Sequence, residues 1–195
     1  MAQQLAPFPR SLGMFKAYHA PQPETLVLKE KIMSLSGDSF DIKTIDGRPV
    51  FKVQGNAFSL SGRKMVMDMT GNQLFTIRKR HLRLHATYYA EDPSEREILQ
   101  VEGKFSFGSS KSVATFTGEG GRRESLFMKG DFFDRKASIT DEASGQAVAT
   151  INRQFLNARE LLGGQQTYHV TVAPNVDMAL IVAMCICLDE RRNEK

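Results

Sequence analysis

Short runs of β-branched, aromatic and long apolar residues recur along the chain from Glu24 onward, and glycine or acidic residues interrupt them at short intervals. Turn signals about every 8–12 residues are typical of an all-β sandwich or barrel. Consecutive strands joined by short turns pair side by side, so we expect an antiparallel meander. The pattern predicts strands at residues 25–31, 40–44, 50–54, 65–68, 73–80, 85–90, 98–105, 112–117, 125–130, 136–140, 147–152 and 168–172.

One short pattern occurs at residues 46–53, 68–77 and 141–151. In each copy an acidic residue and a glycine are followed by strand residues at fixed offsets from that glycine. Glycine suits a tight hairpin turn because positive φ angles are costly for residues with a Cβ atom. Any β protein accumulates such turns, which is the alternative to a true repeat, and both interpretations favour an antiparallel meander.

An almost unbroken apolar run, residues 178–188, lies close to the end of the chain. It is shorter than the roughly 20 apolar residues that span a bilayer, and it lacks the polar face of a surface helix. Residues 175–188 are therefore predicted to form a helix surrounded on all sides, with Asn175 or Asp177 near its N-terminus. Closing the sheet into a barrel removes the sheet edges and encloses this helix. The side chains expected to fill the barrel are Val176, Met178, Leu180, Ile181, Met184, Cys185 and Leu188.

The length and composition fit one domain with its own core, since 41% of the 195 residues are hydrophobic. The proline-rich residues 1–23 are predicted to form an irregular arm, and residues 24–195 a single barrel domain. The formal net charge of +4 is compatible with anionic partners, but it does not indicate nucleic acid. Residues 1–10 lack the apolar stretch of a secretory signal, so we expect a cytoplasmic protein.

Several segments of the chain resemble the LURP-one-related proteins of plants and fungi. They carry the patterns FDI at 40–42, GxPVFxVxG at 47–55, MDxxGxxLFxIRK at 67–79 and YxVxVxPxVDxALI at 168–181. The resemblance implies the tubby-like C-terminal fold, shared with phospholipid scramblases, in which a closed twelve-stranded antiparallel β-barrel surrounds a hydrophobic helix near the C-terminus. Members of the family are mostly uncharacterised. Some plant members are tied to defence against pathogens, and the related tubby domains bind phosphoinositides through a basic surface.

Catalytic and metal-binding patterns are weak in this sequence. His81 and His85 have the i, i+4 spacing of a helical metal pair, but they fall at a predicted hairpin. Cys185 and Cys187 lie inside the apolar run and are interpreted as buried small hydrophobic residues. No Gly-x-Ser-x-Gly motif occurs, and the glycine-rich segment 118–121 lacks the Lys-Ser/Thr ending of a phosphate loop. We therefore expect no catalytic residue, no metal and no cofactor.

Basic residues gather at one predicted hairpin, where they are interleaved with histidines and leucines. Arginine binds phosphate through two parallel hydrogen bonds, and a basic residue near an anionic lipid surface contributes about 1 kcal/mol. The alternative is that strand alternation divides Arg78 and Arg80 from Lys79, which leaves a charged rim. The candidate patch for anionic headgroups consists of Arg78, Lys79, Arg80 and Arg83, joined by Lys129, Arg135 and Lys136 if their strands are neighbours.

These observations favour a non-enzymatic binding module, peripheral at membranes, that binds phosphoinositide headgroups or an anionic membrane surface. One alternative is a protein-interaction scaffold in stress or defence signalling, which rests on the resemblance alone. A second alternative is scramblase-like lipid translocation. Against it, the apolar run is about half a span, and the charged residues 189–195 do not extend it. We therefore do not expect a transmembrane protein.

Overall fold

A computed structural model of the chain describes residues 5–29, 39–55, 63–80, 87–104, 111–131, 136–152 and 167–193. Within these ranges a short 3-10 helix, η1 (Lys16–Tyr18), precedes the strands, and one α-helix, α2 (Met178–Asn193), follows them. The strands are β1 (Glu24–Lys29), β2 (Ser39–Thr44), β3 (Pro49–Gly55), β4 (Lys64–Asp68), β5 (Gln73–Arg80), β6 (Thr87–Glu91), β7 (Glu97–Lys104), β8 (Lys111–Thr117), β9 (Arg123–Asp131), β10 (Lys136–Asp141), β11 (Ala147–Asn152) and β12 (Thr167–Val172).

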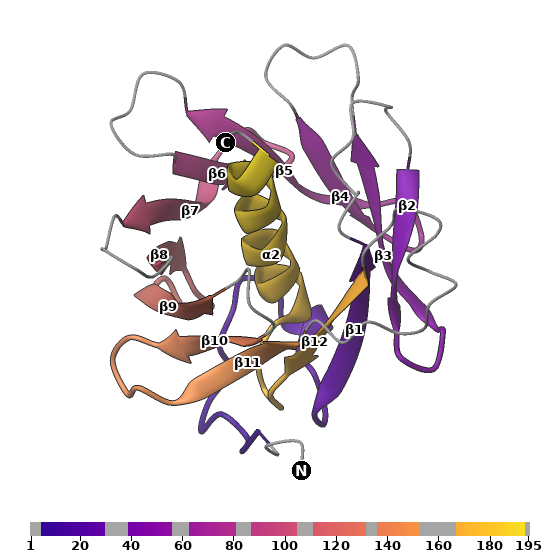
Figure 1. Ribbon diagram of the computed structural model, residues 1–195. Coiled ribbons are helices and arrows are strands. Elements are labelled where there is room, and N and C mark those ends of the chain that lie inside the picture. Colours follow the sequence, from indigo (N-terminus) through magenta and orange to yellow (C-terminus); the bar gives the residue numbers. More distant parts are fainter. Residues whose placement is uncertain are drawn as a thin grey trace.

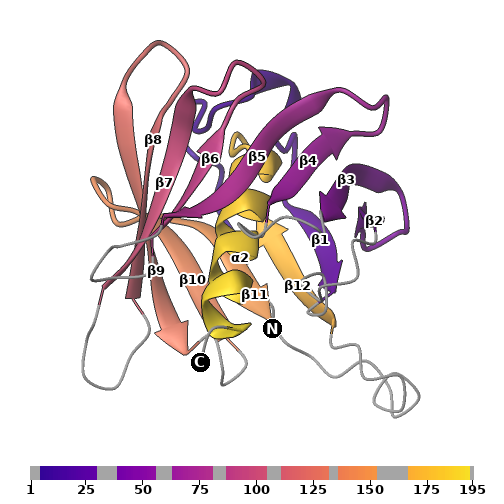
Figure 2. The same cartoon turned by 90° about the horizontal axis from the view of Figure 1, so that it is seen from above.

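The strands close into one antiparallel barrel, in which β1 pairs with both β2 and β12. The ring of strands surrounds α2 when the molecule is seen from either direction (Figure 1 and Figure 2). The predicted closed twelve-stranded antiparallel barrel around a C-terminal helix is confirmed. Each strand hydrogen-bonds to a neighbour on both sides, so closure leaves no sheet edge among the described strands.

The predicted strands agree with the observed ones to within a few residues. The strand predicted at 125–130 begins earlier, because the ladder between β8 and β9 continues until Thr117 pairs with Arg123. A backbone ladder does not depend on side-chain polarity, so the polar residues Arg123 and Glu124 extend β9. The predicted strand residues 30, 31, 85, 86 and 105 lie outside the described residues.

Aspartates organise tight turns between the strands. Asp68 Oδ1 accepts hydrogen bonds from the backbone N–H groups of Thr70 and Asn72, both at 2.9 Å. Asp92 accepts backbone N–H groups of its own turn in the same way. Glycines with positive φ occupy the repeated pattern at Gly47, Gly71 and Gly145. The acidic residue and the glycine therefore have separate roles, since one satisfies N–H groups and the other adopts the left-handed backbone.

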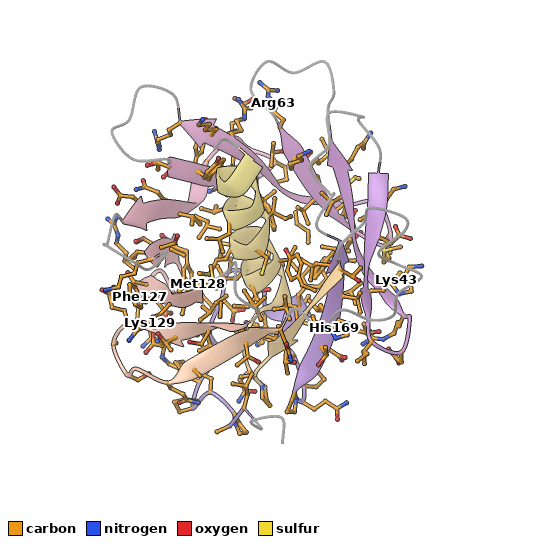
Figure 3. All side chains as sticks on the ribbon, in the orientation of Figure 1. Lys43, Arg63, Phe127, Met128, Lys129 and His169 are labelled. Carbon is orange, nitrogen blue, oxygen red and sulfur yellow. The ribbon has the colours of Figure 1, made fainter. Side chains whose placement is uncertain are left out.

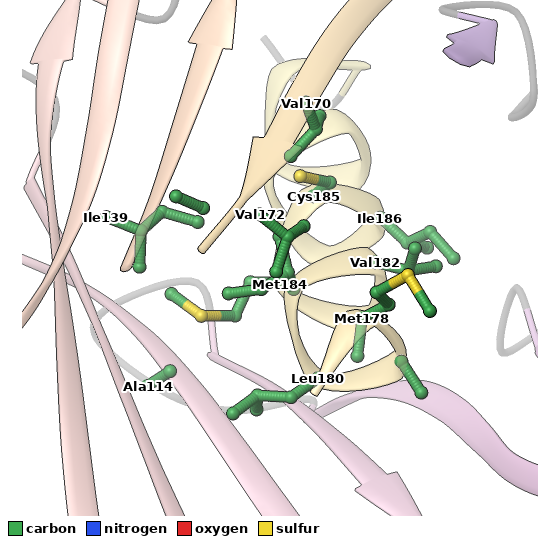
Figure 4. Close-up of a cluster of buried hydrophobic side chains, with 14 of the residues drawn as sticks. Ala114, Ile139, Val170, Val172, Met178, Leu180, Val182, Met184, Cys185 and Ile186 are labelled. Atoms are coloured by element: carbon green, nitrogen blue, oxygen red, sulfur yellow. The ribbon is translucent and has the colours of Figure 1, made fainter. Parts of the chain in front are cut away.

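The helix α2 is packed on every side against the inner faces of the strands. Between residues 178 and 188 no side chain is more than 8% exposed. In Figure 4, Val170 and Val172 of β12 lie beside the helix, and Met184 extends toward Ile139 of β10. This packing confirms the expected core, because the structure buries Val176, Met178, Leu180, Ile181, Met184, Cys185 and Leu188.

The helix begins later and ends later than the predicted range 175–188. It begins at Met178 because Asp177 caps it, with Asp177 Oδ1 accepting the backbone N–H of Ala179 at 2.8 Å. Asn175 has a φ of 67° and belongs to the turn before the helix. The helix ends at Asn193, beyond the apolar run, because its i to i−4 hydrogen bonds do not require apolar side chains.

The N-terminal arm, residues 5–23, crosses the end of the barrel where α2 begins, and it is the indigo segment of Figure 1. Phe8 and Leu12 are buried there, at 2% and 0% exposure. The N–H of Phe8 donates to Pro174 O and the N–H of Leu12 to Asn175 O, both at 3.0 Å. The arm has little regular structure, yet it packs into the core. Its prolines indicated irregularity but carried no information about burial.

Asp177 connects this arm to the helix. Its side chain is fully buried, and Oδ2 accepts the N–H groups of Met14 and Phe15 at 3.0 and 2.9 Å. Burial raises the pKa of Asp177 to about 6, against an ordinary value of 3.8, although these N–H groups oppose the shift. A Cβ atom at Gly13, where φ is +150°, would lie 2.1 Å from the Cβ of Asp177. Only glycine therefore allows the arm to approach the carboxylate this closely.

An ion pair and a contact between a histidine and a carboxylate attach the arm to the neighbourhood of the β8–β9 turn. Arg10 Nη2 lies 2.6 Å from Glu124 Oε2, and His19 Nε2 lies 3.6 Å from Glu119 Oε1. Burial lowers the pKa of His19, while the Glu119 carboxylate acts in the opposite direction. The arm thus engages part of the acidic charge at this end of the barrel.

Candidate binding surface at the basic end of the barrel

The two ends of the barrel differ in the charge of the residues at which the strands begin and end. At the end that we call the basic end, the strand termini include Lys29, Lys64, Arg80, Lys104, Lys111 and Lys136. At the opposite end, which the arm crosses and which we call the arm end, they include Glu24, Asp68, Glu91, Glu97 and Asp141. The strand β9, from Arg123 to Asp131, has the reverse polarity. The fold therefore converts a modest net charge into a strongly polarised barrel.

Exposed cations add to this basic end. Arg63 directly precedes β4, and Lys129 lies near the end of β9. Both side chains are exposed, and neither forms an ion pair with another residue in the part of the chain that the structure describes. Figure 3 shows them on different sides of the barrel, with Met128 toward the helix and Phe127 and Lys129 away from it. These two side chains are available to an anionic partner.

A pair of lysines faces each other across two strands of the basic end. Lys104 of β7 is directly opposite Lys111 of β8 in the antiparallel register. The register therefore places two basic residues side by side in the backbone ladder at this end.

Arg78 and Arg80 of the predicted patch are held by acidic residues. Arg78 Nε lies 2.8 Å from Glu91 Oε2, and Arg80 forms an ion pair with Glu97. The guanidinium carbon of Arg80 also lies 4.7 Å from the centroid of the Tyr89 ring, in a cation–π arrangement. Both carboxylates belong to strand termini of the arm end. The charge of these arginines is therefore balanced within the protein.

The fold does not gather the other predicted patch residues beside these arginines. Lys79 follows the inner face of β5, so strand alternation divides the hairpin cations between the two faces of the sheet. Lys129 and Lys136 belong to β9 and β10, which β6, β7 and β8 separate from β5. Their strands are not neighbours of β5, so the condition for one continuous patch is not met. Arg83 and Arg135 lie outside the described residues.

The predicted patch does not include Arg63, Lys64 and Lys111, because these cations are not close together along the chain. The signal that would have found them is the order of charges at the strand termini. The acidic residue comes first in β1 and β7, and the basic residue comes first in β4 and β10. Because successive antiparallel strands reverse direction, this alternation places all the basic termini at one end.

Candidate metal ligands do not assemble in the part of the barrel that the structure describes. Within these ranges, no group of His, Cys, Asp or Glu has the size and proximity to hold a metal ion. His81 and His85 lie outside the described residues, and both cysteines are buried. Of the helices in the described ranges, none combines the length and the apolar character needed to cross a membrane. The described surface offers a partner many charged side chains, besides the exposed hydrophobic side chains of Ile45 and Met69.

A closed antiparallel barrel around a buried C-terminal helix, with one basic end and one end covered by an arm, defines the class of this protein. The chain belongs to the LURP-one-related family, whose model matches residues 24–189. The matched range includes every described strand and most of α2, and it excludes the arm. The resemblance seen in the sequence is therefore confirmed.

Similar proteins cover most of the chain. Protein LURP-one-related 15 of Arabidopsis thaliana is 26% identical over 197 residues, which span 97% of this chain and 90% of the relative. Uncharacterized protein YxjI of Bacillus subtilis (strain 168) is 26% identical over 164 residues, which span 84% and 91%. The X-ray structure of a protein from Arabidopsis thaliana matches with a TM-score of 0.60 and 19% identity, covering 93% of this chain and 99% of that one. The likeness to that structure concerns the fold alone.

Proposed function

We propose that this chain is a non-enzymatic binding module whose basic end docks onto an anionic membrane surface carrying phosphoinositide headgroups. The observation that carries the proposal is the concentration of lysine and arginine at the strand termini of one end of the barrel. Anionic lipids attract such residues, and each basic residue close to the surface contributes about 1 kcal/mol.

The arrangement of these cations suits a flat partner. They come from β1, β4, β7, β8 and β10, which are distributed around the circumference of the barrel. Cations in a ring at one end approach a plane together, whereas a patch on the barrel wall brings only neighbouring strands near it. Electrostatic attraction is screened beyond about 8 Å at physiological salt, so simultaneous contact matters.

The arm end supports the same orientation. Its strand termini are acidic, and the side chains of Asp46, Glu95 and Glu142 in its turns are exposed. An anionic surface repels these carboxylates and attracts the basic end. Both forces turn the barrel axis toward the membrane normal, with the arm directed away from the lipid.

Flotation with phosphatidylcholine vesicles, alone or containing phosphatidylserine or phosphatidylinositol bisphosphate, tests this proposal. The basic-end variant Arg63→Gln, Lys129→Gln removes two exposed cations. We expect it to bind anionic vesicles roughly 30-fold more weakly than the wild type, because two contacts of about 1 kcal/mol are lost.

The matched control is the arm-end variant Lys16→Gln, Lys43→Gln, which also removes two exposed cations and changes the net charge equally. We expect the control to bind as the wild type does. Equal weakening of both variants, or wild-type protein that does not prefer anionic over neutral vesicles, would contradict docking through the basic end.

A further inference from the structure

The outer wall of the barrel is uncharged across four neighbouring strands, β1, β12, β11 and β10, which lie side by side in Figure 1. Apart from the terminal Lys29 and Lys136, the described outward positions of these strands hold no Asp, Glu, Lys or Arg. Their side chains are half-buried and alternate with the fully buried side chains of the core. We call this surface the neutral wall, and it consists of Thr25, Val27, Ser138, Thr140, Thr150, Asn152, His169 and Thr171.

Strand propensity explains the threonines and the valine of the neutral wall, but it does not explain the lack of charge. β-branched residues suit any strand. Charged residues form 25% of the chain and belong mostly at the surface, so a wall of this size without them is unusual. The flanking strands do carry charge, since the exposed Lys43 of β2 is opposite Val27 and the exposed Lys129 of β9 is opposite Ser138. Depletion of charge inside a charged border is typical of the core of a protein interface.

Hydroxyl groups of the neutral wall already form hydrogen bonds within the barrel. The Oγ1 atoms of Thr25 and Thr171 lie 2.9 Å apart, and Thr140 Oγ1 donates to Phe127 O at 3.2 Å. A hydroxyl that keeps a hydrogen bond inside the protein loses less free energy when water is removed from it. The neutral wall can therefore be covered by a partner at a low desolvation cost.

The lack of charge suits a second copy of this chain. A two-fold interface brings the same patch of both copies together, so a charged patch would repel itself, whereas the neutral wall does not. A two-fold axis that runs across the strands would also make the two barrels antiparallel. The basic end of each copy then lies beside the arm end of the other, and the strand termini of these two ends carry opposite charges.

We infer that two copies of this chain associate through their neutral walls, side by side and antiparallel. Four strands at a spacing of about 4.8 Å, each five or six residues long, present a face of roughly 350 Å². A standard interface buries about 800 Å² on each partner, so this dimer is weak and reversible. The inference does not depend on the proposed docking to membranes.

Sedimentation velocity at protein concentrations from about 5 to about 500 µM tests the association, because a weak dimer forms only as the concentration rises. We expect the sedimentation coefficient of the wild type to increase toward that of a dimer. The wall variant Thr150→Glu places a carboxylate in the middle of the neutral wall, close to its own copy across the two-fold axis. We expect it to dimerise at least about 30-fold more weakly, because two like charges meet in the interface.

The matched control is Thr115→Glu. Thr115 is also half-buried on the outer wall, but it belongs to β8, opposite Ser125 and outside the neutral wall. We expect this control to dimerise as the wild type does. A mixture of Thr150→Glu with Thr150→Lys separates a lost interface from a lost fold, since opposite charges near the axis should restore association that neither variant shows alone.

Thiol cross-linking between two variants determines the orientation. One variant carries Lys129→Cys near the basic end, and the other carries Glu142→Cys at the arm end. Both positions are exposed, whereas the native Cys185 and Cys187 are buried. Antiparallel copies should give cross-links between the two variants, and parallel copies would give them within each variant.

A wild type that stays monomeric at about 500 µM overturns association through the neutral wall. Equal weakening by Thr150→Glu and Thr115→Glu overturns it too, as does a mixture of the two charged wall variants that associates no better than its components. Cross-links found only within each variant overturn the antiparallel arrangement. Antiparallel cross-links, together with restored association in the mixture, support the dimer.

Discussion

Asp177 carries a carboxylate into the core, where each of its oxygens serves a different element. One oxygen caps α2 through the N–H of Ala179, and the other accepts the N–H groups of Met14 and Phe15 in the arm. The sequence predicted an acceptor near the start of the helix, because Asp177 precedes the apolar run. It did not predict the contact with the arm, since no local pattern links residues so far apart along the chain.

Burial of Asp177 makes the free energy of unfolding depend on pH. The folded chain holds this proton up to about pH 6, whereas the unfolded chain releases it near the ordinary pKa of 3.8. Between these values the folded state binds more protons, so the free energy of unfolding falls as pH rises. The raised pKa corresponds to about 3 kcal/mol of the free energy of unfolding. This contribution is fully present below the unfolded pKa of 3.8 and is lost above the folded pKa of about 6.

Urea unfolding of the wild type and of Asp177→Asn at several pH values across this window measures the effect. Asparagine cannot ionise, so we expect the difference between the two unfolding free energies to change by up to about 3 kcal/mol, in favour of the variant as pH rises. The altered hydrogen bonds change the unfolding free energy of the variant by an amount that does not depend on pH. Parallel profiles would show that Asp177 does not titrate in this range.

At the scale of elements, local pattern predicted most of the fold. Alternating polarity and glycine turns located the strands, because a strand with one buried face must repeat with a period of two. The length and uniform apolarity of 178–188 predicted an enclosed helix. The same reasoning predicted that α2 ends at residue 188. The helix continues to Asn193, because its backbone hydrogen bonds do not require apolar side chains. It also missed Phe8 and Leu12 as core residues, because a short irregular segment has no period.

The enclosure of α2 predicts a large loss of stability when its side chains are shortened. Leu180 is fully buried, and we expect Leu180→Ala to lower the free energy of unfolding by about 2–5 kcal/mol, since the removed atoms leave a cavity between the helix and the barrel wall. The control Met69→Ala changes a side chain that is 44% exposed, and should stay within about 0.5 kcal/mol of the wild type. Chemical denaturation gives both values, and similar losses for the two variants would contradict an enclosed helix.

At the scale of the whole molecule, the barrel separates charge between its ends. Lys29, Lys64 and Lys104 come from strands far apart along the chain, yet all of them terminate strands at the basic end. The net charge of +4 indicated no such separation. The predicted hairpin patch counted the charges of Arg78 and Arg80 as open to a ligand. Both arginines form ion pairs, with Glu91 and Glu97, and only the pairing of β5, β6 and β7 brings these carboxylates to them.

Docking through a ring of cations should depend strongly on salt. The screening length falls from about 10 Å at 0.1 M to about 3 Å at 1 M ionic strength, so we expect binding to phosphatidylserine vesicles to weaken steadily across this range. Flotation at increasing salt measures the slope. The Arg63→Gln, Lys129→Gln variant should show a smaller slope than the wild type, and the Lys16→Gln, Lys43→Gln variant the same slope. Binding that does not respond to salt would indicate an apolar contact instead.

The sequence by itself determined the strands, the enclosed helix and the barrel that surrounds it, because these features follow from local periodicity and from the need to bury apolar surface. Only the tertiary structure decided which cations share one end, which arginines meet a carboxylate, and where the arm is buried. Those outcomes depend on strand direction and register, which bring together residues that are distant in the chain. Lys64 and Lys79 therefore face the interior beside each other, although nothing in their local sequence relates them.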